Sequence, residues 1–316
     1  MHVFHGYDHI PRELRGAALA IGNFDGVHRG HQALIERARE RAQASSRRGA
    51  AHLAGVMMFE PHPREFFHPE RPHFRLTTLP QKLALLERYE LDVAVVIPFD
   101  HRLASMTAEE FIEQVLVAGL GVRHVVIGYD FLFGKGRSGS AEDIRRAGAD
   151  MGFGVSVIAP IGEGGEVFSS SAIRAEIAHG DVKGAAEMLG HWWAVRGKVV
   201  GGFKKGTGMG FPTANIHLPK ATILAHGIYA VFVDVQDKRH QGAAYLGTRP
   251  TFDNGPPVLE IFLLDFDGDL YDREIEVSFV DFIRGDQRFE GMEALMAQMT
   301  KDCDKARQIL AAAPQL

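Results

Sequence analysis

The sequence predicts two domains, an α/β domain around a parallel sheet followed by an antiparallel barrel or sandwich that ends in a helix. Its length of 316 residues is enough for about two domains of typical size, each with its own core. Up to about residue 185, short apolar runs alternate with amphipathic stretches, as in β-α-β units. Beyond about residue 190, strand-like runs follow one another with Gly, Pro and Asp between them. We therefore expect domains over residues 1–186 and 187–316.

In the first domain, valine-rich runs without alternation predict strands that are buried on both faces. We expect these strands over residues 17–21, 54–59, 93–98, 125–127 and 155–158. A helix is expected over residues 32–45, directly after the first strand. Thr107 and Glu110 form a capping box, which predicts a helix that runs to about Gly119. A short helix over residues 170–179 stops at the glycine that follows it.

In the second domain, several strand-like runs alternate between apolar and polar residues, which predicts strands with one face in a core. These runs cover residues 195–200, 227–235, 241–246, 259–264 and 274–282. One helix, over about residues 291–312, is expected to close the chain. We find neither an internal repeat nor a low-complexity linker between the two halves.

Composition narrows the classes of partner and the compartment. The net charge of -5 leaves no excess of Lys and Arg to neutralise a phosphate backbone, so we expect no nucleic-acid partner. Cys303 is the single cysteine, which excludes a disulfide within the chain and suits a reducing cytosol. The start lacks the layout of a signal peptide, and no apolar run approaches the ~20 residues that span a bilayer. We therefore expect a soluble, cytoplasmic protein with no membrane partner.

A glycine-rich loop lies between the first predicted strand and the next helix, where α/β folds bind ligands. Gly22, Gly26 and Gly30 let the backbone approach a phosphate closely. His28 and His31 are three residues apart, so both imidazoles can donate hydrogen bonds to phosphate oxygens from one side of a helical turn. A surface loop or a zinc pair would also explain two histidines, but no third ligand follows at an evident spacing. We favour an ATP-phosphate site that stabilises charge during attack on the α-phosphate.

Two further segments of the first domain are weaker candidates. The run from Ser169 to Arg174 places hydroxyls and a guanidinium at a helix start, which suits a second anion site. An ordinary serine N-cap is the alternative there. The turn Pro61-His62-Pro63 follows the second predicted strand and can present His62 to a ligand, although such a segment is often only a turn.

The second domain carries a glycine-rich string of its own between two strands. Alternating glycines leave backbone amides available to an anion, and a lysine adds charge upstream. These residues are Lys205, Gly206, Gly208 and Gly210. Pro212 rigidifies the exit, and Thr213 and Asn215 point to one face of an extended strand, where their oxygens suit a Mg²⁺ ion that also holds ATP phosphates. A glycine-rich hairpin without a ligand is the alternative.

Glu260 lies near the start of the otherwise apolar run over residues 259–264. A carboxylate there is either a rim residue in contact with water or a general base that accepts a proton from a substrate hydroxyl. The second interpretation gains from the turn-rich segment over residues 247–252, which can border a cleft. We take Glu260 as the candidate base.

Taken in order, these motifs resemble those of the bacterial bifunctional riboflavin kinase/FMN adenylyltransferases. The first half carries Gly-Asn-Phe-Asp-Gly-Val-His-Arg-Gly-His at 22–31, Phe-Glu-Pro-His-Pro at 59–63, Gly-Tyr-Asp-Phe-x-Phe-Gly at 128–134 and Ser-Ser-Ser-x-Ile-Arg at 169–174. The second half carries Gly-Phe-Pro-Thr-Ala-Asn at 210–215, Gly-Thr-Arg-Pro-Thr-Phe at 247–252 and Phe-Ile-Arg at 282–284. The resemblance implies a Rossmann-like nucleotidyltransferase domain followed by a Greek-key β-barrel kinase domain.

The resemblance also implies roles for individual residues. In the first domain, His28 and His31 would hold ATP phosphates together with Gly22, Asn23, Asp25, Gly30, Ser169, Ser170, Ser171 and Arg174. The flavin would lie near His62, Pro63 and Asp130. In the second domain, Thr213 and Asn215 would hold Mg-ATP beside the glycine-rich string, Glu260 would activate the riboflavin 5′-hydroxyl and Arg284 would lie near the flavin.

The implied reactions share ATP and a flavin. The second domain would phosphorylate riboflavin to FMN with Mg-ATP, and the first would transfer AMP from another ATP to FMN, releasing pyrophosphate and FAD. Riboflavin, FMN, FAD and ATP are thus the expected ligands and Mg²⁺ the expected cofactor. One alternative is a monofunctional FMN adenylyltransferase with a degenerate kinase domain. Another is a barrel that binds flavin or RNA as a sensor without catalysis.

Overall fold

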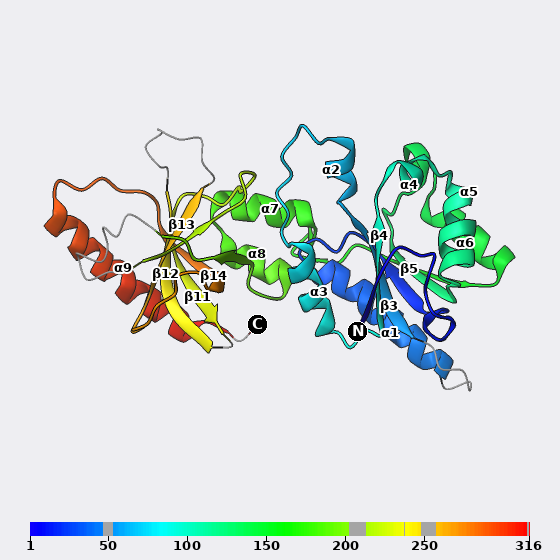
Figure 1. Ribbon diagram of the computed structural model, residues 1–316, viewed down its shortest axis with the longest axis horizontal. Helices are drawn as coiled ribbons and strands as arrows, with labels where there is room; N and C mark the ends of the chain where they lie inside the picture. Colours follow the sequence, from blue (N-terminus) through cyan, green and yellow to red (C-terminus); the bar gives the residue numbers. More distant parts are fainter. Residues whose placement is uncertain (47–52, 202–212, 237, 248–256, 315) are drawn as a thin grey trace. The chain divides into compact units, whose positions relative to one another are not determined.

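The computed structural model describes residues 1–46, 53–201, 213–236, 238–247, 257–314 and 316. The chain forms two compact units, Met1–Phe168 and Ser169–Leu316, each with a sheet and a hydrophobic core of its own (Figure 1). The expected boundary between residues 186 and 187 lies inside a helix of the second unit, α8 (Val182–Leu189).

The sheet of the first unit is parallel throughout, as predicted, and has the order β1-β4-β3-β2-β5-β6. Its strands are β1 (His2–His5), β2 (Ala18–Ile21), β3 (Ala54–Glu60), β4 (Val93–Pro98), β5 (His124–Gly128) and β6 (Gly154–Ile158). The order reverses at β2, because β3 and β4 extend the sheet to one side and β5 and β6 to the other. Such a reversal places a ligand crevice at the carboxyl ends of the strands around β2.

Helices cover both faces of this sheet (Figure 1). The α-helices described in this unit are α1 (Arg29–Ser46), α2 (Pro63–Phe67), α3 (Leu79–Glu87), α4 (His101–Ser105), α5 (Ala108–Glu110) and α6 (Ala141–Met151). Helices α1 and α3 pack on one face, and α4 to α6 pack on the other. The capping box of Thr107 and Glu110 is present, and α5 continues as a π-helical segment over Phe111–Gly119, as the sequence predicts for one helix.

Short elements complete the first unit. Strands β7 (Gly162–Glu163) and β8 (Glu166–Val167) form a small antiparallel hairpin near its end. Single 3-10 turns lie at Arg12–Leu14 and Lys135–Arg137. Strand β1 has no counterpart in the sequence prediction, because its four residues are mostly exposed and carry no apolar period.

The second unit is a Greek-key sheet in the order β10-β13-β12-β11-β14-β9, with every pair antiparallel. Its strands are β9 (Ala194–Lys198), β10 (Ala214–His217), β11 (Gly227–Val235), β12 (Lys238–Leu246), β13 (Val258–Leu263) and β14 (Glu274–Arg284). Strands β11, β12 and β13 follow one another as a meander, and β10 lies beside β13, which is the Greek-key arrangement. A bridge between Val200 and Asn215 joins the two edges into a near-closed barrel.

Within its described residues, the second unit has three helices beside the barrel strands. Helices α7 (Ser170–His179) and α8 precede it, and the predicted C-terminal helix is α9 (Met292–Ala312). Trp192 and Cys303 belong to the apolar cluster that joins α9 to the sheet. Trp193 stacks on Phe279 with ring centroids 4.9 Å apart in the barrel core.

Candidate active sites

Three candidate segments of the first unit end neighbouring strands. The loop over residues 22–28 follows β2, the turn over residues 60–63 follows β3, and residues 128–130 follow β5. Because β3 and β5 pair with β2 on its two sides, all three segments lie at one edge of the sheet. This edge carries the histidines expected for ATP phosphates and the residues expected near the flavin.

The loop after β2 has an unusual backbone. Phe24, Gly26 and Val27 have φ angles of 50°, 81° and 43°. Left-handed backbone is costly for non-glycine residues, above all for a β-branched one, and amounts to about 1–3 kcal/mol each. Surrounding contacts must therefore hold the loop in this shape.

His28 and His31 lie together at the start of α1. Their rings stack with centroids 3.7 Å apart and an interplanar angle of 26°. The backbone N–H of His31 donates to Nδ1 of His28 at 3.4 Å, so a neutral His28 carries its proton on Nε2. A Cβ on Gly30 would lie 3.0 Å from the His28 ring, which explains why glycine stands between the two histidines.

Burial keeps His31 uncharged. The pKa of His31 lies well below its ordinary value of 6.5, first because of burial and then because of the charges of His28 and Lys82. Nδ1 of His31 and Oδ1 of Asn23 are buried and have no hydrogen-bond partner within the part of the chain that the structure describes. Buried polar atoms are normally bonded, so these two atoms fit contacts to a ligand.

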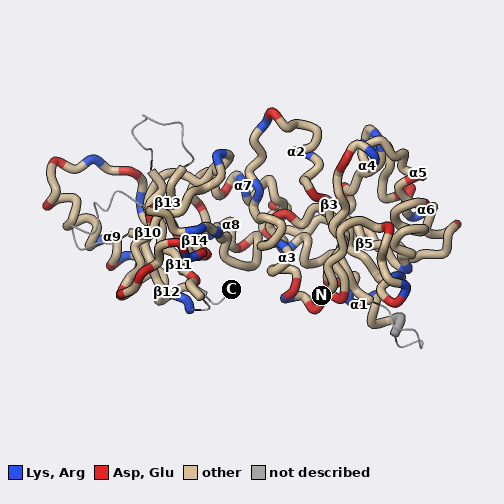
Figure 2. Tube along the Cα trace, viewed as in Figure 1, with Lys and Arg blue, Asp and Glu red and all other residues tan. Residues whose placement is uncertain are grey.

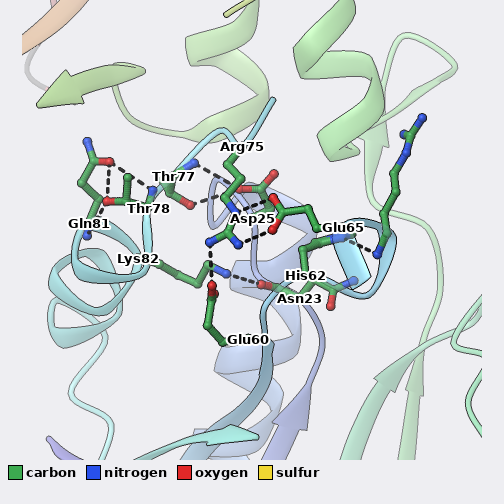
Figure 3. A network of polar contacts seen from close by, with 11 residues as sticks. Asn23, Asp25, Glu60, His62, Glu65, Arg75, Thr77, Thr78, Gln81 and Lys82 are labelled. Carbon is green, nitrogen blue, oxygen red and sulfur yellow. Dashed lines mark hydrogen bonds and ion pairs between the residues drawn. The ribbon is translucent and has the colours of Figure 1, made fainter. Parts of the chain in front are cut away.

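The carboxylate of Asp25 faces the protein interior. It is 3% exposed and accepts hydrogen bonds from the backbone N–H groups of Leu76 and Thr77 at 3.2 and 3.1 Å. Nζ of Lys82 donates to the carbonyl oxygen of Asn23 at 2.8 Å (Figure 3). Sequence reasoning missed Thr77 and Lys82, because their contacts to the loop span more than 50 positions.

An arginine holds the turn after β3. Arg75 donates to Glu60 at 2.7 Å and to Glu65 through Nε at 2.6 Å (Figure 3). The hydrogen bond from Arg75 lowers the pKa of Glu65 below its ordinary value of 4.5. Nδ1 of His62 accepts from the N–H of Arg64 at 3.1 Å and so caps α2, which orients the imidazole.

Aromatic side chains gather beside this turn. The ring of Phe66 lies 5.3 Å from that of Phe99 and 5.0 Å from that of His101, and Phe67 is 57% exposed. Such rings can stack against a planar ligand. Sequence reasoning did not select them, although the pair of phenylalanines directly after the Pro-His-Pro turn was a visible signal. The predicted residue Asp130 is exposed at the end of β5.

The serine-rich string forms the start of α7 in the second unit. Oγ of Ser169 accepts from the N–H of Ala172 at 3.1 Å, so this serine is a helix N-cap. Nη1 of Arg174 donates to the carbonyl oxygen of Ser170 at 3.1 Å, and Ser171 is exposed. A phosphate contact for this string stays a prediction.

A polar row crosses the barrel. Glu260 on β13 pairs directly with Asn215 on β10 and with Tyr245 on β12. Directly opposite residues share a face, with Cβ atoms about 4.5–5.5 Å apart. Asn215 is 7% exposed, and its Nδ2 donates to the carbonyl oxygen of Thr213 at 3.4 Å, whereas Glu260 is exposed. The predicted residues Thr213, Asn215 and Glu260 are thus neighbours.

Tyr245 is a member of this row that sequence reasoning missed. Burial raises the pKa of its phenol, and the carboxylates of Asp286 and Glu260 raise it further. The register of β12, β11 and β14 continues the row through Ile228 to Arg284. Other expected kinase residues, Lys205, Gly206, Gly208, Gly210 and Pro212, lie outside the described residues.

The guanidinium of Arg284 is held by helix α9. It donates to Asp302 through Nε at 3.0 Å and through Nη2 at 2.7 Å, and Asp302 also accepts from Gln298 at 2.9 Å. The side chain of Asp302 is 5% exposed. Arg284 therefore ties β14 to α9 at the end of the polar row, and its contact with a flavin stays a prediction.

A parallel α/β unit with a histidine loop at its switch point, followed by a Greek-key barrel, is the architecture of a two-domain transferase that uses nucleotides. Residues 10–172 match the family model described as FAD synthetase, and residues 189–310 match the one described as riboflavin kinase. The chain belongs to the family of bifunctional riboflavin kinase/FMN adenylyltransferases. Since both halves match, the alternative of a degenerate kinase domain finds no support.

Similar proteins cover almost the whole chain. The bifunctional riboflavin kinase/FMN adenylyltransferase of Pseudomonas fluorescens is 39% identical over 98% of this chain and 98% of its own length. The protein of the same description from Escherichia coli K12 is 39% identical over 96% of this chain and 95% of its own, and that from Bacillus subtilis is 33% identical over 97% and 96%. A crystal structure described as the macrolide-efflux protein from Streptococcus pneumoniae has a TM-score of 0.85 at 27% identity, covering 97% of this chain and 99% of that one.

Two features of the described chain bear on its partners. None of its helices is long and apolar enough to cross a membrane. Figure 2 shows Lys and Arg interspersed with Asp and Glu along the described parts of each unit.

Proposed function

We propose that this chain makes FAD from riboflavin in two steps, each at the expense of ATP. The second unit phosphorylates riboflavin to FMN, and the first transfers AMP from ATP to FMN with release of pyrophosphate. Support comes from the match of each half to the corresponding family model and from the polar site that each unit builds. The observation that carries the proposal for the kinase half is the direct cross-strand pairing of Asn215 with Glu260.

For adenylyl transfer, we assign the ATP phosphates to the loop after β2. An oxygen of the FMN phosphate attacks the α-phosphorus of ATP, and the bond to the bridging oxygen of the leaving pyrophosphate breaks. Nε2–H of His28 is a donor for the charge that builds on the phosphate oxygens, and the neutral ring of His31 retains one N–H as a second donor. No covalent intermediate with the protein is required, because positioning and charge stabilisation suffice.

We assign the flavin of FMN to the carboxyl ends of β3 and β5, the strands on either side of β2. His62 and Pro63 border the aromatic rings after β3, and Asp130 follows β5 on the other side of β2. The exposed ring of Phe67 suits contact with a planar heterocycle. Gly22, Asn23 and Gly30 supply backbone and an amide at the phosphate end, whereas Asp25 supports the loop from behind.

For phosphorylation, we assign Glu260 as the base that accepts the proton of the riboflavin 5′-hydroxyl while its oxygen attacks the γ-phosphorus of ATP. Asn215 lies on the neighbouring strand β10 and Thr213 directly precedes that strand, where the phosphates of ATP would be held. Tyr245 lies on the other side of Glu260 from Asn215, between the carboxylate and the part of the row that ends at Arg284. Arg284 completes the row, positioned by Asp302.

The same residues fit a Mg²⁺ ion. Magnesium prefers oxygen ligands and keeps several waters. With Nδ2 of Asn215 donating to Thr213, its Oδ1 is the atom that would bind the ion, together with the hydroxyl of Thr213. The ion would neutralise charge on the phosphates of ATP.

Dependence on ATP in both reactions and the lone Cys303 support a cytoplasmic location. We also propose that a division of the chain near residue 186 separates the two activities.

Two substitutions test the assignment in the full-length protein. Glu260→Gln should lower FMN formation from riboflavin about 10²- to 10⁴-fold, because it removes the base, while FAD formation from supplied FMN is retained. His28→Ala should do the opposite. Glu274→Gln, an exposed glutamate on β14, is the matched control and should leave both activities unchanged. Retention of FMN formation by Glu260→Gln would contradict the kinase assignment.

A further inference from the structure

A buried polar cluster lies behind the loop over residues 22–28 and includes side chains to which no role has been assigned. Its members are Asp25 in the loop and Thr77 and Lys82 from the segment around the start of α3 (Figure 3). We infer that Thr77 and Lys82 are positioning residues for adenylyl transfer, which hold this loop in the shape that presents His28 and His31 to ATP. We name Asp25, Thr77 and Lys82 the loop clamp.

Thr77 ties two consecutive residues of the loop through a single hydroxyl. Oγ1 of Thr77 donates to Oδ1 of Asp25 at 3.3 Å and accepts from the backbone N–H of Gly26 at 3.0 Å. The N–H of Thr77 donates to the same carboxylate oxygen at 3.1 Å. A serine can make both hydroxyl contacts, whereas a valine of the same shape makes neither.

Lys82 ties the loop at a third point. Its side chain is buried, with 5% of the residue exposed, and Nζ donates to the carbonyl oxygen of Asn23 at 2.8 Å. Burial lowers the pKa of Lys82, and the charges of Asp25 and Glu60 act against that effect. A buried ammonium is expensive, and an apolar side chain of similar volume often gives equal or greater stability. Stability alone therefore does not account for a lysine at this position.

The backbone of the loop explains what the clamp is needed for. Phe24 and Val27 hold left-handed φ angles of 50° and 43° without being glycine, and such backbone persists only where surrounding contacts over-determine it. The clamp attaches at residues 23, 25 and 26, between and beside these two residues. His28 comes next in the chain, so relaxation of the loop would displace the stacked histidines directly.

The inference rests on the proposed assignment of this loop to the phosphates of ATP. It is tested in the full-length protein with two matched pairs, Lys82→Met against Lys82→Arg and Thr77→Val against Thr77→Ser. Arg88→Met removes an exposed cation just after α3 and is the control for charge loss. FAD formation from FMN and ATP gives kcat and both KM values. FMN formation from riboflavin reports the second unit in the same preparation.

We expect kcat for FAD formation to fall about 10- to 100-fold in Lys82→Met and Thr77→Val, the scale of a small misplacement of catalytic groups. KM for FMN should stay within about twofold, and the arginine and serine variants should recover kcat to within about threefold. The rate of riboflavin phosphorylation should be unchanged in all of these variants, and Arg88→Met should form FAD at the wild-type rate. Circular dichroism checks folding, and if Lys82→Met does not fold, the threonine pair decides by the same criteria.

Two results would overturn the inference. One is a kcat for folded Lys82→Met or Thr77→Val within about twofold of wild type, which is too small for a displaced active site. The other is an equal loss in the conservative and the disruptive variant of both pairs. His28→Ala separates these failures from a failure of the site assignment. If His28→Ala also retains FAD formation, the loop is not the phosphate site; if it alone abolishes the activity, only the loop clamp is refuted.

Discussion

Removal of Asp302 should destabilise the second unit far more than removal of a surface carboxylate from the same interface. Asp302 on α9 accepts hydrogen bonds from Nε and Nη2 of Arg284 and from Gln298, and the paired side chains are only 5% and 20% exposed. Asp302→Ala leaves a guanidinium largely buried without its partner, which costs about 3–5 kcal/mol. At an m-value of about 2 kcal/mol/M, the lower bound moves the urea midpoint down by about 1.5 M.

Tryptophan fluorescence measures this change selectively, because the chain has two tryptophans and both, Trp192 and Trp193, lie in the second unit. The matched control is Asp265→Ala, which breaks the pair with Arg307 on the same helix. Those side chains are 80% and 40% exposed, so the loss should stay below about 1 kcal/mol. Similar midpoints for the two variants, at unchanged m-value, would refute the reasoning that the buried pair fastens α9 to the barrel.

Three further outcomes are expected. Gly30→Ala should lower FAD formation at least about tenfold and leave FMN formation unchanged. The reason is that the added Cβ would lie 3.0 Å from the His28 ring and 3.2 Å from the carbonyl oxygen of Phe168. A rate of FAD formation equal to that of wild type would show that the histidine stack tolerates the methyl group. The pKa of Glu65 is depressed in the folded state, so its bond to Arg75 stabilises the fold above pH 4.5 and loses this effect as the pH falls through the lowered pKa. Urea unfolding followed by circular dichroism should therefore show a gap between wild type and Arg75→Met that narrows from pH 6 to pH 3, and a constant gap would contradict it. Burial raises the pKa of the Cys303 thiol from 9 to about 11. Modification of Cys303 by a thiol reagent at pH 8 should therefore be about a hundredfold slower in the native protein than in urea. Comparable rates in the two conditions would contradict the burial of this thiol.

The fold was predictable wherever the local pattern was strong. Valine-rich runs such as Val93–Pro98 carry enough apolar residues to identify buried strands, and the capping box at Thr107 marks a helix start whatever the surroundings. Strand β1 escaped prediction because four mostly exposed residues at the sheet edge have no apolar period. The unit to which a helix belongs was also hard to predict, because packing in the structure, and not the local sequence pattern, groups helices α7 and α8 with the second unit.

The candidate sites, too, contain residues that local sequence patterns indicate and residues that only distant contacts bring in. Glycines and histidines at short spacing indicated the loop with His28 and His31, since one turn of helix relates them. The contact of Lys82 with Asn23 spans 59 positions, and that of Arg284 with Asp302 spans 18 between a strand and a helix. Nothing in the local sequence indicates which lysine or aspartate is buried, so these partners were missed.

By itself, the sequence determined the order of the two folds, and it predicted the loop that carries the paired histidines and the polar residues Thr213, Asn215 and Glu260. Those features depend on neighbours within a few residues, where helical and strand periods relate side chains directly. Only the tertiary structure decided that Asp25 faces inward to Thr77, that Tyr245 adjoins Glu260 and that Asp302 holds Arg284. Such pairings follow from strand register and from the packing of helices on sheets, and these are settled by burial of the whole core rather than by any one segment.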